Sequence, residues 1–280
     1  MSYARPQNLD DALALLAEDS WQILAGGTDY YPALHDEQPH GNLLDVTILD
    51  GARVIQKIDG HWAIGAAVTW GDIIGAGLPH AFDALKLAAR EVGSVQIQNR
   101  ATLAGNICNA SPAADGVPPL LVLDAEVELA SVRGVRRSAL SEFILGNRRT
   151  ALASDELVTR ILIPEGSAEG TSSFLKLGAR SYLVISISMV AVRLVVGGTG
   201  QIDDVAISVG ACSEVALRLP EAEDAIRNAN IRDDWSTRLK AEHFATLSPI
   251  DDVRASAEYR NDATLELVRR TLIAAMHEAA

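Results

Sequence analysis

The stretch Trp21-Gln-Ile-Leu-Ala-Gly-Gly-Thr-Asp29 joins an apolar run to a pair of glycines. The run predicts a short strand over 21–25, and Pro32 indicates a short helix just beyond the glycines. Because glycine has no Cβ, a turn at Gly26 and Gly27 can bring backbone amides close to a ligand. Consecutive amides in such a turn bind anions, so this stretch is a candidate phosphate site, with a plain turn as the alternative.

A second stretch of this kind, Thr102-Leu-Ala-Gly-Asn106, lies further along the chain and continues to Asp115. Its small residues predict another turn able to approach a phosphate. Asp115 can accept a hydrogen bond from a ribose hydroxyl, or it can cap a helix that begins near Gly116. Neither stretch is a Walker loop or a GxGxxG fingerprint. Two loops that grip one pyrophosphate from both sides suit a dinucleotide better than a mononucleotide.

The composition describes an acidic globular chain. Its 280 residues, 48% of them hydrophobic, predict about two domains with packed cores. A net charge of −13 disfavours nucleic acid and anionic membranes as partners. Cys108 and Cys212 are the only cysteines, too few for an iron–sulfur cluster, and the histidines show no metal-binding spacing. With no apolar run long enough to cross a bilayer and no signal-peptide pattern, we expect a cytoplasmic protein without membrane insertion.

The order of apolar patterns predicts an α+β fold in two domains. A polar, glycine-containing segment over 164–171 indicates a linker, so we expect one domain over 1–167 and a smaller one over 168–280. In the first domain, helices are predicted over 9–18 and 81–92, and strands over 42–46, 61–65, 157–163 and within 120–131, the last entered from a short helix. In the second domain, strands over 188–196 and 201–210 predict a hairpin, followed by helices over 221–228 and 262–278.

The two glycine stretches, with two later segments, resemble one known family. The segments Ala25–Asp29, Thr102–Asn106, Thr150–Pro164 and Phe174–Val192 follow the order found in the FAD-binding medium subunits of the molybdenum hydroxylases. That group contains xanthine dehydrogenase and aerobic carbon monoxide dehydrogenase. The resemblance covers nearly the whole chain. It implies a two-subdomain PCMH-type FAD-binding domain, followed by a CO dehydrogenase flavoprotein-like C-terminal domain of antiparallel sheet plus helices.

The resemblance also implies roles for individual residues. The first loop would wrap the FAD pyrophosphate, and the second would contact the diphosphate and the neighbouring ribityl or ribose groups. Asp115 would hold the adenosine half, Val92 and Gly93 would lie near the flavin ring, and Ile185 would cover the isoalloxazine. The implied cofactor-binding set is Ile23, Leu24, Ala25, Gly26, Gly27, Thr28, Asp29, Tyr30, Val92, Gly93, Thr102, Leu103, Ala104, Gly105, Asn106, Asp115 and Ile185.

The chain departs from the family pattern at two places. Ala104 stands where the second loop usually has a glycine, and its methyl group is acceptable if the backbone φ is negative. Val184-Ile185-Ser186 replaces an acid–Ile–Ala run, which leaves the electron acceptor open. A bulky side chain at Gly26 or Gly105 is expected to exclude FAD while leaving the chain folded.

The implied function is electron transfer through non-covalent FAD. A small partner subunit would supply electrons from its [2Fe–2S] centre, and NAD⁺, a quinone or another acceptor would take them. The molybdenum cofactor would sit on a large partner subunit, in an assembly expected to be a dimer of heterotrimers. No residue of this chain is expected to act as a catalytic acid or base or to bind a metal. The alternatives are a self-contained FAD-dependent oxidoreductase with its own substrate site and a scaffold protein whose glycine loops are only turns.

Other side chains have plain structural interpretations. Cys108 is expected to pack near a turn rather than to contact the cofactor. Trp21, Trp62 and Trp70 are expected in the core or at an interface. Five arginines form a basic cluster in this acidic chain, either a solvated strand edge or a docking surface for a partner subunit: Arg133, Arg136, Arg137, Arg148 and Arg149.

Overall fold

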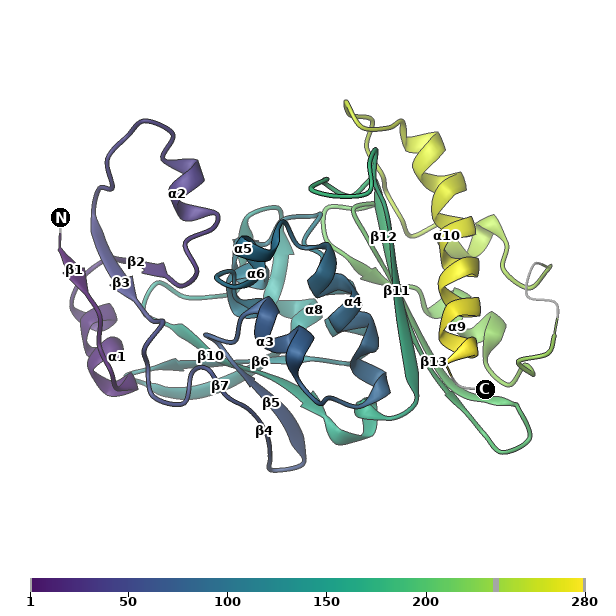
Figure 1. The fold of residues 1–280 in the computed structure, drawn as a ribbon, viewed down its shortest axis with the longest axis horizontal. Helices are drawn as coiled ribbons and strands as arrows, with labels where there is room; N and C mark the ends of the chain where they lie inside the picture. The colour runs from purple at the N-terminus through teal and green to yellow at the C-terminus, as the bar shows by residue number, and fades with distance from the viewer. Residues whose placement is uncertain (1, 234–236, 279–280) are drawn as a thin grey trace.

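The computed structural model describes residues 2–233 and 237–278 and begins with a small parallel sheet. Strands β1 (Tyr3–Ala4), β3 (Asn42–Asp45) and β2 (Trp21–Leu24) lie side by side in that order. Helix α1 (Leu9–Glu18) is capped by Asn8, whose side chain accepts a hydrogen bond of 2.9 Å from the Asp11 amide. Its apolar stripe packs against β3, so this sheet forms the left-hand end of the molecule (Figure 1). The short helix α2 (Tyr30–Ala33) follows the first glycine loop.

The centre of the molecule is a five-stranded antiparallel sheet of order β4-β5-β10-β6-β7. Helices lie above this sheet in Figure 1, around a core that contains Trp70, Phe82, Leu103 and Phe143. The strands are β4 (Ile55–Ile58), β5 (His61–Gly65), β6 (Glu126–Ser131), β7 (Gly134–Ala139) and β10 (Leu157–Pro164). The helices are α3 (Trp70–Gly75), α4 (Asp83–Glu91), α5 (Val95–Gln98), α6 (Leu103–Asn109), α7 (Val117–Val122) and α8 (Leu140–Phe143), with a small hairpin of β8 (Ile144–Gly146) and β9 (Arg149–Thr150).

The C-terminal part is a four-stranded antiparallel sheet held between two helical layers. Its order is β11 (Thr171–Leu177), β12 (Ser188–Val196), β13 (Ile202–Gly210), β14 (Leu217–Arg218). One face packs against α4 and α7 of the central part. The other face packs against α9 (Pro220–Ile226) and the long α10 (Ala257–His277), as the right-hand side of Figure 1 shows. The α+β fold, with a C-terminal antiparallel sheet plus helices, is therefore confirmed.

Three boundaries differ from the sequence prediction for local reasons. Helix α10 begins at Ala257 rather than at residue 262, because the Ser256 side chain caps it by accepting from the Tyr259 amide. The helix predicted over 81–92 is divided into a 3-10 turn (His80–Phe82) and α4. The linker predicted over 164–171 contains a 3-10 turn (Glu165–Ala168) and the first residue of β11. The domain boundary between residues 167 and 168 stays a prediction.

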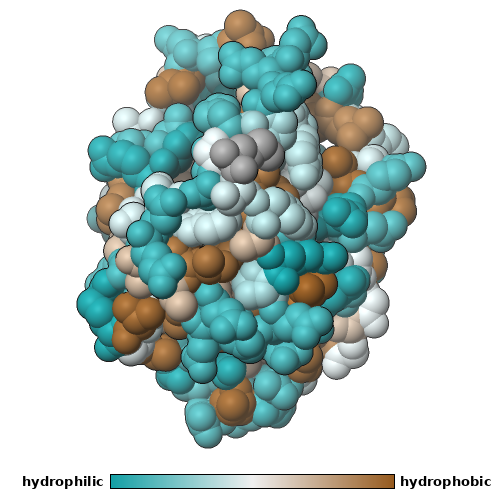
Figure 2. Space-filling view, turned by 90° about the vertical axis from the view of Figure 1, so that its left-hand side faces the viewer, coloured by the Kyte–Doolittle hydropathy of each residue, from teal (hydrophilic) through white to brown (hydrophobic). Residues whose placement is uncertain are grey.

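The surface of the N-terminal end carries mostly hydrophilic side chains with hydrophobic ones scattered among them (Figure 2). In the ranges 2–233 and 237–278, no helix has the length and apolar character needed to cross a membrane. Within the same ranges, no three His, Cys, Asp or Glu residues are grouped in a way that would hold a metal ion.

Candidate cofactor-binding site

A cavity of about 670 Å³ lies where the N-terminal sheet meets the helices of the central part. Its walls come from the end of β2 and the loop after it, from the first turns of α6, and from the beginning of β10. Cavities of this size are typical of cofactor and small-molecule sites. Segments that are distant in the sequence therefore meet around one space.

The first glycine loop lines this cavity and has backbone donors without partners in the described part of the chain. Strand β2 ends at Leu24, and the chain turns through Gly27 with φ of +73°, a conformation that favours glycine. The amide groups of Gly26, Gly27, Thr28 and Asp29 donate no hydrogen bond to any described part of the chain. Four successive unpartnered donors at a cavity wall form an anion-binding nest.

Gly26 has a second role that the sequence did not reveal. A Cβ built on Gly26 would lie 2.1 Å from the backbone oxygen of Arg100, just before the second loop. The absence of a side chain therefore lets the two loops touch each other. A bulky residue at Gly26 is therefore expected to lower the stability of the fold as well as to exclude FAD, because backbone atoms would have to move.

The second glycine stretch is the start of a helix rather than a turn. Thr102 is the N-cap of α6, and its Oγ1 accepts a 3.0 Å hydrogen bond from the Gly105 amide. The Leu103 amide donates to the Val68 oxygen at 3.1 Å, so these donors are already occupied. Ala104 has the negative φ of a helical residue, and its methyl group is accommodated in the buried wall.

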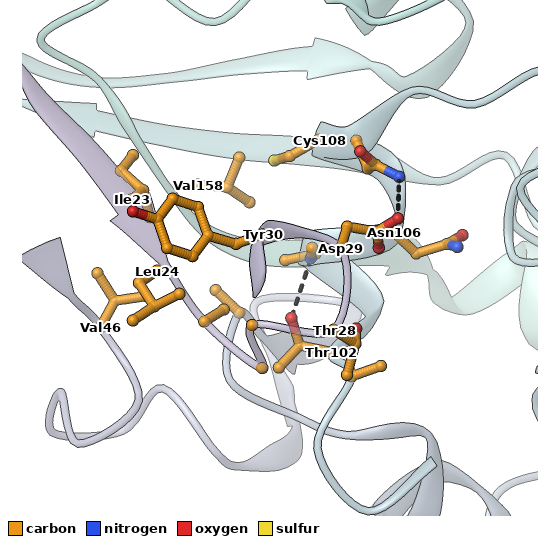
Figure 3. A pocket seen from close by; sticks show the side chains of 18 of the residues that line it. Ile23, Leu24, Thr28, Asp29, Tyr30, Val46, Thr102, Asn106, Cys108 and Val158 are labelled. Atoms are coloured by element: carbon orange, nitrogen blue, oxygen red, sulfur yellow. Dashed lines mark hydrogen bonds between the residues drawn. The ribbon is translucent and has the colours of Figure 1, made fainter. Parts of the chain in front are cut away.

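The cavity has one apolar end and one polar end. Figure 3 shows Ile23, Leu24, Val46 and Val158 around the Tyr30 ring on one side, and Thr28, Asp29, Thr102 and Asn106 on the other. Two buried polar atoms of the lining, Tyr30 Oη and Trp70 Nε1, have no hydrogen-bond partner within the described residues. Asn106 accepts a 3.3 Å hydrogen bond from the Gly116 amide through Oδ1. The lining thus suits a ligand with flat apolar groups and a charged phosphate link, which fits FAD.

Most of the predicted site residues line this cavity, and four do not. Leu103 is fully buried in the core below it, and Gly93, with φ of +53°, lies against Ile97 outside the lining. Asp115 and Ile185 lie beyond the cavity, toward the C-terminal sheet. The predicted residues that line it are Ile23, Leu24, Ala25, Gly26, Gly27, Thr28, Asp29, Tyr30, Val92, Thr102, Ala104, Gly105 and Asn106.

Asp115 links the central part to the C-terminal sheet. Both of its carboxylate oxygens lie 2.9 Å from Lys176 Nζ, and Ser186 Oγ donates to one of them at 3.2 Å. Burial raises the pKa of Asp115, and the Lys176 ammonium opposes that rise. The alternative role as a helix cap is wrong, because Gly116 is the N-cap of α7 and Asp115 makes no capping bond.

The contact between Asp115 and Ser186 also shows where Ile185 lies. Ile185 is the neighbour of Ser186, and its side chain is 62% exposed. Asp115 and Ile185 therefore lie at the same end of the site. The roles implied for them, at the adenosine half and at the isoalloxazine, stay predictions.

The structure adds lining residues that sequence reasoning missed or interpreted differently. Cys108 lines the cavity, and burial raises the pKa of its thiol to about 12, so the thiol is neutral at physiological pH. Lys176, the partner of Asp115, carried no motif signal because the two residues are far apart in sequence. The further lining residues are Ala33, Val46, Ala66, Trp70, Ile97, Ala101, Asn109, Arg148, Leu152, Leu157 and Val158.

The predicted arginine cluster divides into two groups. Arg136 pairs with Glu156 at 2.7 Å, Arg133 pairs with Asp155, and Arg137 lies 3.9 Å from Glu128. These three side chains are engaged along the strand edge. Arg148 instead reaches the cavity, and its neighbour Arg149 does not line it.

Comparisons with known proteins agree with this site. Residues 1–166 match the FAD binding domain in molybdopterin dehydrogenase, and residues 173–275 match the CO dehydrogenase flavoprotein C-terminal domain. The nicotine 6-hydroxylase medium subunit of Paenarthrobacter nicotinovorans is 31% identical over 98% of this chain and 96% of its own length. The xanthine dehydrogenase FAD-binding subunit of Escherichia coli O157:H7 is 30% identical over 92% of this chain and 90% of its own.

Solved structures show the same architecture. A chain of the reconstituted CO dehydrogenase from Oligotropha carboxidovorans superposes with a TM-score of 0.88 at 26% identity, covering 97% of this chain and 96% of that one. One conclusion follows from the cavity and its loop amides, from the two domain matches and from these relatives. The chain belongs to the family of FAD-binding medium subunits of the molybdenum hydroxylases, and it is an oxidoreductase flavoprotein subunit.

Proposed function

We propose that this chain carries electrons from a partner's [2Fe–2S] centre to NAD⁺, a quinone or another acceptor through FAD held in the cavity. The observation that carries the proposal is the run of four amides from Gly26 to Asp29 that have no hydrogen-bond partner among the described residues. Bound FAD would supply the ability to exchange electrons both singly and in pairs. The residues of this chain bind and orient the cofactor and keep water from it.

The loop amides would bind the diphosphate of the cofactor. Main-chain donors suit this task, because they are already oriented by the turn and the contact with Arg100 holds the turn in place. The side-chain amide nitrogen of Asn106, which donates to no described residue, and the Thr28 hydroxyl add donors at the same end. The apolar side chains at the other end would exclude water from a flat ring.

Partner subunits complete the proposed electron path. A relative from Hydrogenophaga pseudoflava is named a carbon monoxide dehydrogenase medium chain, and one from Paenarthrobacter nicotinovorans is named a subunit of a 6-hydroxypseudooxynicotine dehydrogenase complex. We assign the molybdenum cofactor to a large partner subunit and the [2Fe–2S] centre to a small one, in a dimer of heterotrimers. We expect no residue of this chain to act as a catalytic acid or base, since bound FAD would supply the redox chemistry.

The visible spectrum of the purified chain tests the proposal. We expect a flavin spectrum, release of FAD by heat or acid at about one per chain, and no turnover without partners. Turnover by the isolated chain would support a self-contained FAD-dependent oxidoreductase instead. A colourless chain that does not bind added FAD would contradict both functions.

A further inference from the structure

Three chain segments meet at one side of the cavity through a line of polar side chains. Asn109, at the end of α6, donates from Nδ2 to Asp29 Oδ1 at 2.9 Å, the contact drawn at Asp29 in Figure 3. The Oδ1 atom of the same Asn109 accepts from Arg148 Nη1. Arg148 lies in the turn between β8 and β9, and its own amide donates to the Ala110 oxygen at 2.9 Å. Asn109 therefore joins the first glycine loop to an arginine more than a hundred residues later.

The two charged side chains joined through Asn109 should influence how strongly an anionic ligand binds. Of the described residues that line the cavity, Asp29 carries the negative charge and Arg148 the positive one. Asp29 closes the loop whose free amides would bind a diphosphate, so its carboxylate opposes the ligand by like-charge repulsion. Its hydrogen bond to Asn109 restrains the carboxylate, and the Arg148 charge lies just behind that amide.

The turn that carries Arg148 is held in one geometry. Arg148 has φ of +59°, in the left-handed region that residues with side chains seldom adopt. Its amide bond to Ala110 and the bond of its side chain to Asn109 both reach the end of α6. Two attachments to one helix end hold the exposed Arg148 side chain beside the cavity.

We propose that Arg148 is a positioning residue for the diphosphate-binding loop. It acts through Asn109, restraining the Asp29 carboxylate and compensating its charge, and thereby favours ligands that carry a diphosphate. The inference rests on the proposed FAD function and deepens it. It assigns a role to one arginine of the basic cluster that lies apart from the strand edge.

The chain offers a matched control. Arg149 is the next residue, is also exposed, and donates only to the Leu145 oxygen at 3.3 Å within the described chain. It has the same charge in the same hairpin but does not line the cavity. Arg149→Ala therefore removes the same charge from the same hairpin as Arg148→Ala does. It leaves the hydrogen bonds that join Arg148, Asn109 and Asp29 intact.

The experiment measures the dissociation constants of FAD and of riboflavin, which has no phosphate, for the full chain freed of flavin. Arg148→Ala should weaken FAD binding about fivefold, the size expected when one exposed charge interaction is lost. Riboflavin binding should not change, and Arg149→Ala should bind both ligands as the natural chain does. Asn109→Ala keeps both charges but breaks the line, and it should weaken FAD binding to a similar degree.

Rescue separates this role from a merely structural one. Arg148→Lys should recover most of the FAD affinity, and Asp29→Asn combined with Arg148→Ala should restore it, because the repelling charge is gone. Equal FAD affinity in Arg148→Ala and Arg149→Ala, equal losses for FAD and riboflavin, or no rescue by Asp29→Asn would each overturn the inference. If Arg148→Ala does not fold, the Asn109→Ala result decides the question. A natural chain that binds no FAD would instead overturn the proposed function itself.

Discussion

The two glycine loops look alike in sequence, yet they differ in how their backbone donors are used. In the loop from Gly26 to Asp29, four successive amides have no partner within the described chain. In the stretch from Thr102 to Asn106, three of the five amides are occupied: the Leu103 amide by the Val68 oxygen, the Gly105 amide by the Thr102 cap, and the Asn106 amide by the Thr102 oxygen. The first loop is therefore built to bind a ligand, while the second forms a rigid wall that supports it.

The two loops also depend on different interactions. The second has a local cap, since the Thr102 side chain caps the helix that Thr102 itself begins, and its Leu103 amide also donates to the Val68 oxygen. The first depends on a partner distant in sequence, because Gly26 packs directly against the Arg100 backbone. Substitutions should accordingly do most damage where the two loops meet and less where each is independent.

The largest effect is expected for Gly26→Ala. The new methyl group would lie 2.1 Å from the Arg100 oxygen, and separating two backbone segments should cost about 3 kcal/mol of folding free energy. FAD retention should be lost together with stability. Thermal unfolding and flavin content measure both, with Gly77→Ala as the control, because a Cβ there meets nothing within 4 Å. An unchanged melting temperature in Gly26→Ala would show that the loops do not need this contact.

Thr102→Val should have an intermediate effect on stability and on FAD binding. Losing the cap removes the 3.0 Å bond to the Gly105 amide and should cost about 1–2 kcal/mol of stability. FAD binding should weaken less than in Gly26→Ala, because the second loop supports the ligand instead of donating most of the bonds. Chemical denaturation gives the free energy, and Thr102→Ser, which keeps the hydroxyl, should behave like the natural chain. A larger loss of FAD affinity than in Gly26→Ala would reverse the assigned roles of the two loops.

Gly27→Ala should lower the folding free energy by less than Thr102→Val does. The left-handed φ of +73° disfavours alanine by about 1 kcal/mol. The new Cβ would also meet the Tyr31 ring at 2.7 Å, but that is a side chain able to move away. Denaturation of Gly27→Ala beside Gly26→Ala tests the difference, and equal losses would show that conformation rather than the Arg100 contact governs the loop.

The smallest structural effect concerns Cys108, which follows the second loop. Because burial raises its thiol pKa to about 12, alkylation by iodoacetamide at pH 8 should be slow and should accelerate about tenfold per pH unit. The stability that the neutral thiol contributes is complete below about pH 9 and is lost as the pH rises toward 12. Cys108→Ala should lack that alkaline decline. A reaction rate that levels off near pH 9 would contradict the raised pKa of the Cys108 thiol.

Much of the fold follows from local sequence signals. The apolar stripe of α1 after Asn8 and the hairpin of β12 and β13 around a glycine-rich turn were both predictable, because caps and periodicity act over a few residues. The start of α10 was misplaced, since the cap at Ser256 lies before the clear apolar stripe. Thirteen of the seventeen predicted site residues line the cavity, while Gly93, Leu103, Asp115 and Ile185 do not.

The sequence by itself determined which residues are candidates for binding a dinucleotide, because turn-forming glycines and small residues are visible in the chain. Only the tertiary structure decided what each of them does. The contact of Gly26 with Arg100, the ion pair of Asp115 with Lys176 and the line from Asp29 to Arg148 all join segments far apart in sequence. Such contacts depend on how sheets and helices pack, and no local pattern of residues records that packing.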